Sequence, residues 1–236
     1  MIYIYYIIFC IITIIIIFLY FYKICQTEPE IFTYDSKVNG PTILIIGTTH
    51  GNEPAGYFII KNLIDKLNNK DIILKQGQLI LIPLVNYCGY KLNMRNNFLY
   101  GDINRQYNTS NKINKFIIEQ VINSDFIIDF HEGWGFHKIN NNSIGSTITA
   151  NNTYDSIQIA NNMINDINYT IKDENYKFTL HHNNIIDGTL QEYVKKINKN
   201  YILIEITGQN NIQPLNLRIN QGLILLNNVF IYYDLL

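Results

Sequence analysis

The decapeptide Gly47-Thr-Thr-His-Gly-Asn-Glu-Pro-Ala-Gly56 follows a short apolar run, residues 43–46, and precedes a segment with helical spacing of apolar residues. The apolar run predicts a buried strand, and Phe58 to Leu67 predict a helix. The loop between them carries His50 and Glu53. In open α/β sheets, ligands bind where a strand ends and a helix begins. Zinc accepts both an imidazole and a carboxylate, so this stretch predicts part of a metal site in an α/β fold.

A third candidate ligand follows another strand. Residues 125–130 form a buried-strand pattern, and His131 comes directly after it with two glycines close behind. Because parallel strands end at one edge of a sheet, we expect His131 to meet His50 and Glu53 there. Three protein ligands leave a fourth position for water, as in catalytic zinc sites. The alternatives are that His50 and Glu53 only cap the following helix and that His131 is a hydrogen-bonded residue at a strand end.

The N-terminal residues 2–22 are apolar or aromatic except for Thr13. This length is enough for a helix to cross a hydrocarbon core of about 30 Å, and tyrosines at both ends suit the membrane interfaces. The alternative is a secretory signal peptide, but the start carries no positive charge and no small-x-small cleavage site precedes Lys23. We therefore predict an uncleaved transmembrane anchor over residues 1–23, facing an undetermined side, and a linker over residues 24–40.

Composition limits the remaining chain to one folded domain, predicted over residues 41–236. The 236 residues are 47% hydrophobic and 16% charged, which leaves enough apolar material for a core. The net charge of -1 gives no indication of a nucleic-acid partner. The three cysteines, at positions 10, 25 and 88, predict neither a disulfide framework nor a Cys-x-x-Cys zinc motif. The Asn-x-Ser/Thr triplets are expected by chance in so asparagine-rich a chain, and we predict no glycosylation.

Strand and helix patterns alternate along the domain. Beyond the elements above, strands are predicted over residues 78–85 and 201–206 with an edge strand over 176–180, and helices over 111–121, 154–167, 188–199 and 215–230. The polar residues 86–108 and 143–149 predict loops. The alternation predicts an α/β fold with a mostly parallel, mixed central sheet and helices on both faces.

Several short motifs now stand in a fixed order: His-Gly-Asn-Glu, Asn86 with Gly89, Arg95, Asp-Ile-Asn-Arg, Asp-Phe-His and Ile-Glu-Ile. In this order they resemble the zinc metallocarboxypeptidase superfamily. The form His-Gly-Asn-Glu-Pro-x-Gly is most similar to its succinylglutamate desuccinylase/aspartoacylase branch. The resemblance runs from Pro41 to the C-terminal helix and implies a carboxypeptidase-like fold.

The resemblance implies that His50, Glu53 and His131 hold one zinc ion. It implies that Glu205 is the general base, which takes a proton from water and passes it to the departing amine. The residue itself supports a function, because a carboxylate in a strand otherwise built of Ile and Leu is costly to bury without a reason.

The same resemblance assigns roles to three polar residues of the long loop. Arg95 matches the arginine that stabilises the developing oxyanion. Asn104 and Arg105 match the pair that binds a substrate carboxylate, for which the planar guanidinium is suited. The alternative is that Arg95 and Arg105 each only form an ion pair at the surface, without a role in binding or catalysis.

Two departures from the family pattern concern specificity. The tyrosine that classical carboxypeptidases carry before their Gly-Thr-Leu segment is not evident, and His181, His182 and Asn183 occupy that neighbourhood. His182 is a candidate substitute for it. The desuccinylase/aspartoacylase branch also usually has an extra C-terminal β domain, which we do not expect within this chain.

The neighbours of the motifs receive structural interpretations. Glu132, His137 and His182 are interpreted as groups behind the ligands or in solvent. Trp134 and Phe136 are interpreted as the small core of their own loop rather than as a substrate pocket.

The sequence thus predicts a zinc hydrolase that cleaves an amide bond adjacent to a carboxylate, most similar to N-acyl amino acid deacylases. The first alternative is a metallocarboxypeptidase that removes a C-terminal residue from peptides. The second is a non-catalytic domain that binds a carboxylate through Asn104 and Arg105. A third is that the N-terminal apolar run carries the main function and that the folded domain is a tethered remnant. The predicted partners are a small carboxylate-bearing amide or peptide and, through the N-terminal helix, a membrane.

Overall fold

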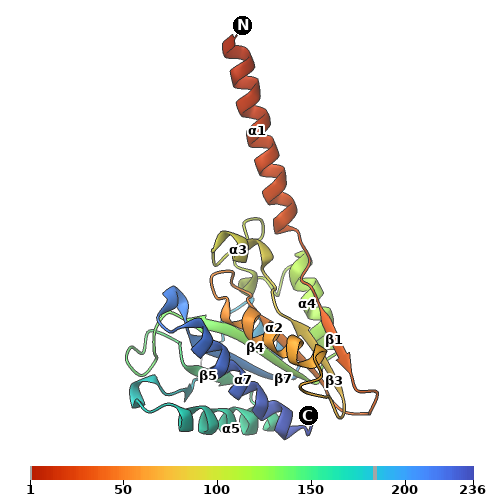
Figure 1. The fold of residues 1–236 in the computed structure, drawn as a ribbon, viewed down its shortest axis with the longest axis vertical. Coiled ribbons are helices and arrows are strands. Elements are labelled where there is room, and N and C mark those ends of the chain that lie inside the picture. Colours follow the sequence, from red (N-terminus) through yellow and green to blue (C-terminus); the bar gives the residue numbers. More distant parts are fainter. Residues whose placement is uncertain (1, 183–184) are drawn as a thin grey trace.

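The computed structural model describes residues 2–182 and 185–236, which form an α/β domain below a long N-terminal helix (Figure 1). Among these residues, seven strands make one sheet in the order β1-β3-β2-β4-β7-β5-β6. The strands are β1 Phe32–Asp35, β2 Thr42–Gly47, β3 Gln78–Ile82, β4 Phe126–Gly133, β5 Thr147–Ala150, β6 Thr179–Leu180 and β7 Asn200–Thr207. The central strands β3, β2, β4 and β7 are parallel, whereas β1 and β5 run antiparallel to their neighbours β3 and β7. The predicted mixed sheet is confirmed.

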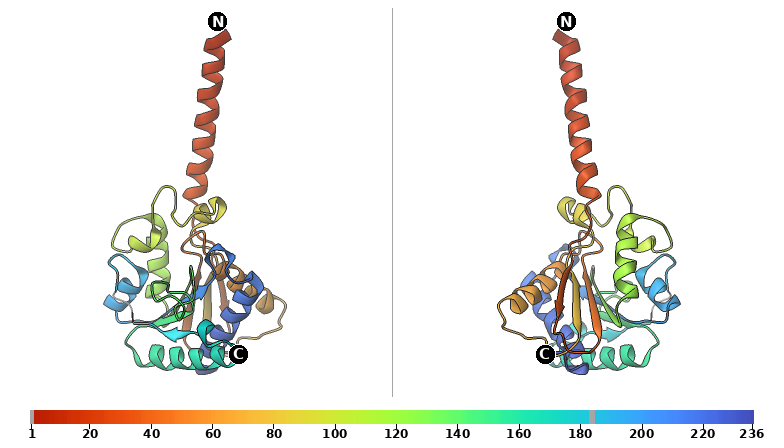
Figure 2. Two further views of the ribbon diagram at one scale, coloured as in Figure 1. Left: turned by 90° about the vertical axis from the view of Figure 1, so that its left-hand side faces the viewer. Right: turned by 90° about the vertical axis from the view of Figure 1, so that its right-hand side faces the viewer.

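Helices cover both faces of the sheet, as predicted (Figure 2). The helices are α1 Ile2–Cys25, α2 Ala55–Asn68, α3 Tyr87–Leu92, α4 Lys112–Ile122, α5 Tyr154–Thr170, α6 Leu190–Lys196 and α7 Leu215–Tyr232, with short 3₁₀ turns η1 Ile103–Arg105, η2 Glu174–Tyr176 and η3 Gln209–Asn211. One core cluster joins the sheet to α2, α5 and α7, and a second joins it to α4 and α6.

Strand β2 shows why the central strands are apolar without a break. Ile43 and Ile45 pack into the α2, α5 and α7 layer, whereas Leu44 and Ile46 pack into the α4 and α6 layer. Successive side chains of a strand point to opposite faces, so a strand covered on both faces must be apolar at every position. Burying each of these side chains contributes about 1.5–3 kcal/mol.

The direction of the strands places the carboxyl edge of the sheet. The chain leaves α1 and enters β1, which runs away from α1 (Figure 1). Strand β3 is antiparallel to β1, and β2, β4 and β7 are parallel to β3. The central strands therefore end at the side of the domain from which α1 emerges.

Three segments differ from the sequence prediction. Strand β1 lies inside the predicted linker over residues 24–40, where its alternating half-buried and exposed residues pair with β3. Strand β5 lies in a predicted loop, because its β-branched residues pair with β7 despite their polarity. Helix α3 lies in the long polar segment, and the side chain of Asn86 caps it by accepting a hydrogen bond from the Gly89 N–H.

The prediction about the cysteines was wrong. Cys25, the last residue of α1, forms a disulfide with Cys88 of α3. The two residues are 63 positions apart, and spacing alone does not show which cysteines meet in the fold. The disulfide ties the N-terminal helix to the folded domain.

Candidate active site

His50, Glu53 and His131 meet at the carboxyl edge of the sheet. His50 and Glu53 lie on the loop between β2 and α2, and His131 lies near the end of β4. The Nδ1 atoms of the two histidines are 3.0 Å apart. Each of these nitrogens also lies 3.0 Å from one carboxylate oxygen of Glu53. All three side chains are buried.

This donor set fits a zinc ion. Ligands placed tetrahedrally about 2 Å from one ion lie about 3.3 Å from each other, close to the separations observed. Burial alone would lower the pKa of His131, but Asp129 and Glu53 outweigh burial and raise this pKa well above its usual value. The cluster therefore holds surplus negative charge, which a divalent cation would neutralise.

The second nitrogen of each histidine faces a carboxylate. Nε2 of His131 lies 3.2 Å from Oδ2 of Asp129, and Nε2 of His50 lies 3.2 Å from Oδ1 of Asp102. Metal-bound histidines commonly have such a partner, which fixes the ring and leaves the other nitrogen for the metal. Asp129 also accepts a hydrogen bond from the Tyr201 hydroxyl at 3.0 Å.

Both aspartates lie within the sequence motifs, but neither was predicted to have a role. The signal for Asp129 was available in its spacing. It lies two residues before His131 in one strand, and residues at that spacing point to the same face of a sheet.

Glu205 lies directly beside the histidine of β4. Strands β4 and β7 are paired so that His131 and Glu205 are register partners. Glu205 is buried, and burial raises its pKa to about 8. A divalent cation at the neighbouring ligands would act in the opposite direction and favour the carboxylate.

Arg95 reaches the ligand set from the loop after α3. Its Nη1 lies 3.1 Å from Oε1 of Glu53, and its Nε lies 3.1 Å from Oδ2 of Asp102. The side chain is 40% exposed, so the guanidinium lies between the buried cluster and the open cavity. Against burial, His50 and then Arg95 lower the pKa of Asp102 well below its usual value.

Asn104 and Arg105 lie on the 3₁₀ turn η1 at the wall of the same cavity. The Asn104 side-chain oxygen accepts a hydrogen bond of 2.9 Å from the Leu190 N–H at the start of α6. This bond fixes the amide, while the exposed Arg105 guanidinium lies 2.6 Å from the Asn104 carbonyl oxygen. The predicted carboxylate-binding pair thus lines one cavity with the predicted metal ligands.

The cavity has a volume of about 300 Å³ and brings together every predicted site residue: His50, Glu53, Arg95, Asn104, Arg105, His131 and Glu205. Trp134 also lines it and is 46% exposed, so its interpretation as loop core was wrong. Phe136 does pack within its loop, stacked on Tyr176 at 4.4 Å between ring centres. Gln209 also lines the cavity and was not predicted; its amide nitrogen donates to Oε1 of Glu53 at 3.0 Å.

Glu132 is a buried group behind the ligands, which is the first of the two interpretations given for it. Its carboxylate accepts a 2.5 Å hydrogen bond from the Ala55 N–H and pairs with the buried Arg218 of α7 at 2.5 Å. Its own N–H donates to Oε2 of Glu53 at 3.1 Å. A Cβ atom at Gly208 would lie 1.8 Å from the Glu132 carboxylate, so the close approach requires glycine there. This network fixes the loop that presents Glu53.

His181 and His182, which stand where the family has its tyrosine, do not line the cavity of the ligand set. His182 is exposed and lines a separate cleft with His181. Asn183 lies outside the described residues. His137, interpreted as a group behind the ligands or in solvent, bonds within its own loop, where its Nδ1 lies 2.7 Å from the Ser143 carbonyl oxygen.

Comparisons with known proteins agree with this geometry. Residues 39–229 match the family described as succinylglutamate desuccinylase/aspartoacylase catalytic domain. An N-alpha-acetyl-L-2,4-diaminobutyric acid deacetylase from Halomonas elongata is 28% identical over 109 residues, which are 43% of this chain and 31% of the relative.

Solved structures show the same fold. Product-bound cell shape determinant protein Csd4 from Helicobacter pylori superposes with a TM-score of 0.73 at 18% identity, over 89% of this chain and 56% of that one. A succinylglutamate desuccinylase from Silicibacter sp. TM1040 superposes with a TM-score of 0.65 at 18% identity, over 88% of this chain and 61% of that one. The chain thus spans about a third of the curated relative and somewhat more than half of these structures.

Proposed function

Because the chain belongs to the succinylglutamate desuccinylase/aspartoacylase catalytic-domain family, we propose that it is a zinc-dependent hydrolase of N-acyl amino acids. The bond cleaved is an amide adjacent to a carboxylate. The observation that carries the proposal is the buried cluster of His50, Glu53 and His131, with Glu205 as the register partner of His131. A carboxylate beside a metal-ligand set is what a general base for hydrolysis requires.

The ligand set would be His50, Glu53 and His131, with Asp102 and Asp129 holding the two rings. Zinc bound there supplies Lewis-acid polarisation of the scissile carbonyl and lowers the pKa of water. Glu205 accepts the proton of the attacking water and delivers it to the departing amine nitrogen. Its burial keeps bulk water away from this transfer.

The remaining cavity residues bind and orient the substrate. Arg95 directs its guanidinium toward the carbonyl oxygen, where negative charge develops as water adds. Asn104 and Arg105 bind the free carboxylate of the amino-acid part, which fixes the amide relative to Glu205. Trp134 at the cavity wall contacts the apolar part of the acyl group or side chain.

A peptide substrate is the second candidate. It is favoured by the likeness to Csd4, one structure of which is described as a D,L-carboxypeptidase bound to mDAP. The deacetylase relative and the local form of the His-Gly-Asn-Glu motif favour the acyl amino acid instead. A panel of N-acetyl and N-succinyl amino acids against short peptides separates the two. Release of free amino acid from peptides alone would refute the deacylase.

The variant Glu205→Gln tests the mechanism, with zinc content measured alongside turnover. Because Glu205 is not among the three ligands, zinc should remain near stoichiometric while turnover falls by about 10²–10⁴-fold, the usual contribution of a general base. Hydrolysis at the original rate would remove Glu205 from the mechanism. Zinc-free protein with no activity on any substrate would instead support the non-catalytic carboxylate-binding domain.

We further propose that residues 1–23 anchor the chain in a membrane and that residues 24–40, which include the edge strand β1 of the sheet, connect this anchor to the catalytic unit over residues 41–236. Helix α1 is long and apolar enough to span a bilayer, and its segment Tyr3–Cys25 has a mean hydropathy of 2.8. A cleaved signal sequence passes the same test. Mass spectrometry of the protein extracted from membranes distinguishes the two, because cleavage would remove the peptides of α1.

A further inference from the structure

We propose that the loop segment Leu92–Phe98, which begins at the last residue of α3, lies in the bilayer beside the base of α1, so that the active-site edge of the sheet faces the membrane surface. The inference builds on the anchor and is independent of the reaction. Lipid would cover the surface formed by this loop and α1, and this surface lies outside the catalytic cavity.

An apolar cleft lies between this loop and α1. Its volume is about 500 Å³, and all its lining residues are apolar: Ile14, Ile17, Phe18, Phe21, Leu92, Met94 and Phe98. Met94 is 45% exposed and Phe98 is 58% exposed, although both are large apolar side chains. The side chains of Met94 and Phe98 extend the exposed apolar surface of α1, so the same lipid acyl chains would cover the loop and the helix.

The position of the loop along α1 agrees with this occupant. Ile14 precedes Cys25 by eleven positions, which is about 16 Å along a helix. The cleft therefore extends along the predicted span itself rather than below it. A side chain beside that part of a membrane helix lies at the depth of the acyl chains.

Covalent and polar contacts fix the loop to the end of α1. The disulfide joins Cys25 to Cys88 in the preceding helix. The buried Asn97 side chain donates to the Cys25 carbonyl oxygen at 3.1 Å. The Asn97 side-chain oxygen in turn accepts hydrogen bonds from the N–H groups of Leu99 and Tyr100, at 2.9 and 3.2 Å. A loop held in this way must follow α1 into the membrane surface.

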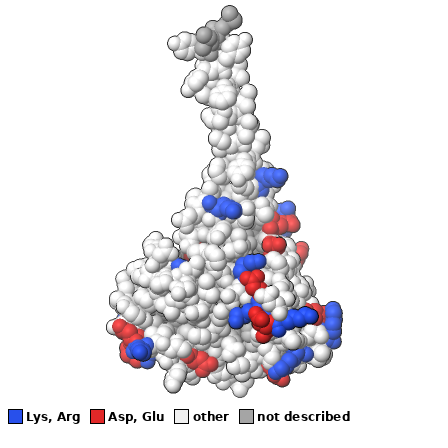
Figure 3. All heavy atoms as spheres, viewed as in Figure 1, with Lys and Arg blue, Asp and Glu red and all other residues white. Residues whose placement is uncertain are grey.

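Basic residues lie where lipid headgroups would be. Lys23 is in the last turn of α1, and Lys91 is at the end of α3. Both are exposed. In Figure 3, blue atoms lie on the visible face at the base of α1 with red atoms just below them, and the visible surface of the helix above them is uncharged. Lysines at the end of a membrane helix place their charge among the headgroups while their stems remain near the apolar region.

The same loop carries a residue of the active site. Arg95 lies between Met94 and Phe98 in sequence, and its carbonyl oxygen accepts hydrogen bonds from the N–H of Gly51 and the side chain of Asn86, both at 3.2 Å. Gly51 follows the metal-ligand candidate His50. Lipid contact at Met94 and Phe98 would therefore hold the Arg95 guanidinium in place from the membrane side.

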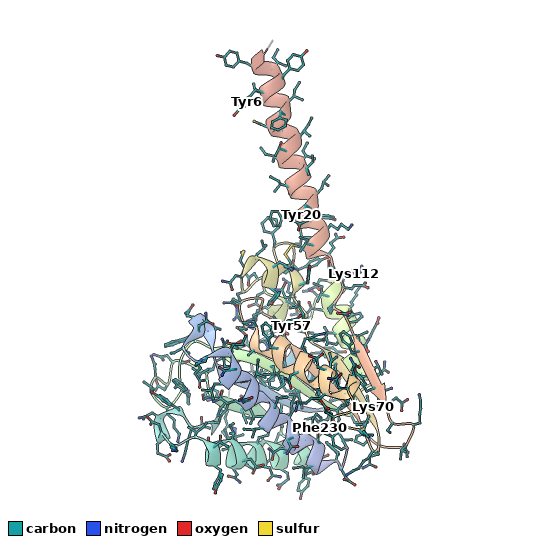
Figure 4. The ribbon with its side chains drawn as sticks, viewed as in Figure 1. Tyr6, Tyr20, Tyr57, Lys70, Lys112 and Phe230 are labelled. Atoms are coloured by element: carbon teal, nitrogen blue, oxygen red, sulfur yellow. A yellow bond between two sulfur atoms is a disulfide. The ribbon has the colours of Figure 1, made fainter. Side chains whose placement is uncertain are left out.

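Tryptophan fluorescence in the full chain tests the proposal. Trp134 is the single tryptophan, so the background variant is Trp134→Phe. Three probes are compared in it: Phe98→Trp in the loop, Tyr20→Trp on α1, where Figure 4 shows the ring projecting from the helix, and Tyr169→Trp on α5. Tyr169 is 94% exposed, and α5 lies at the end of the domain away from α1 (Figure 1).

Each variant is reconstituted in phosphatidylcholine vesicles with and without brominated acyl chains, which quench nearby indoles. The emission of Phe98→Trp should fall about twofold, since the side of its ring that faces away from the domain contacts the acyl chains. Tyr20→Trp should be quenched similarly, and Tyr169→Trp should keep its emission. Circular dichroism and detection of the Cys25–Cys88 peptide confirm that each variant is folded.

Two results would overturn the proposal. If Tyr20→Trp is quenched and Phe98→Trp behaves like Tyr169→Trp, the anchor enters the lipid without the loop. If Tyr20→Trp is not quenched, α1 itself lies outside the bilayer. Neither result bears on hydrolysis, which is measured separately on soluble substrates.

Discussion

The buried pair of Glu132 and Arg218 allows a quantitative prediction for Arg218→Met. Both residues are 1% exposed, and the pair is joined at 2.5 Å. Methionine retains the apolar bulk but leaves the Glu132 carboxylate buried without its guanidinium. Removing one partner of a buried pair costs about 3–5 kcal/mol of unfolding free energy. For a domain of this size, each kcal/mol lowers the melting temperature by about 2–4 °C, so we expect a decrease of about 6–20 °C.

The destabilisation should also depend on pH. Burial raises the pKa of Glu132, and Arg218 is the largest opposing influence, so this pKa should rise further in the variant. The folded state then holds a proton that the unfolded state releases, and stability falls as pH rises above the ordinary carboxyl pKa. The penalty of Arg218→Met should therefore be smaller near about pH 5 than near about pH 8.

Thermal unfolding of the full chain in detergent, followed by Trp134 fluorescence, measures these effects. The matched control is Lys66→Met, an exposed position on α2 that should change stability by less than about 0.5 kcal/mol. The double variant Glu132→Gln with Arg218→Met removes both charges and should recover much of the loss. The reasoning is refuted if Arg218→Met costs no more than Lys66→Met, or if the double variant is no more stable than the single one.

Three further predictions concern the site and its attachment. His131→Ala removes one of three ligands, so zinc measured by atomic absorption should fall well below one ion per chain, and retained stoichiometric zinc would exclude His131 as a ligand. Arg105→Gln should raise KM for carboxylate-bearing substrates by about 10–100-fold with little change in kcat, because it removes a charge-assisted hydrogen bond of about 1.5–3 kcal/mol. An unchanged KM would show that the substrate carboxylate binds elsewhere. Cys88→Ser should abolish a difference in gel mobility between reduced and unreduced chain, and persistence of that difference would exclude the bond to Cys25.

The metal ligands were predictable because they depend on local patterns. Each candidate followed an apolar strand, and parallel strands of one sheet end together, so His131 and the His50 loop had to converge. Glu205 was predictable for a related reason, since it interrupts an apolar strand. The polar loop residues Arg95 and Arg105 were found through the order of motifs, and the structure places both at the same cavity.

The contacts that hold the site were not predictable from such patterns. Arg218 lies on an amphipathic helix, where a charged residue usually faces solvent, and it is buried because α7 packs onto the domain with Arg218 paired to Glu132 of β4. Gln209 follows a glycine in an irregular turn whose backbone no periodicity specifies. Strand β5 was predicted as loop because its polar threonines conceal its pairing with β7, which is a tertiary contact.

The bond between Cys25 and Cys88 has a consequence for the sidedness of the chain. Disulfides form and persist in oxidising surroundings and are rare where glutathione keeps thiols reduced. If α1 is the membrane anchor proposed above, a chain that keeps this bond would carry its folded domain on the oxidising side of the membrane.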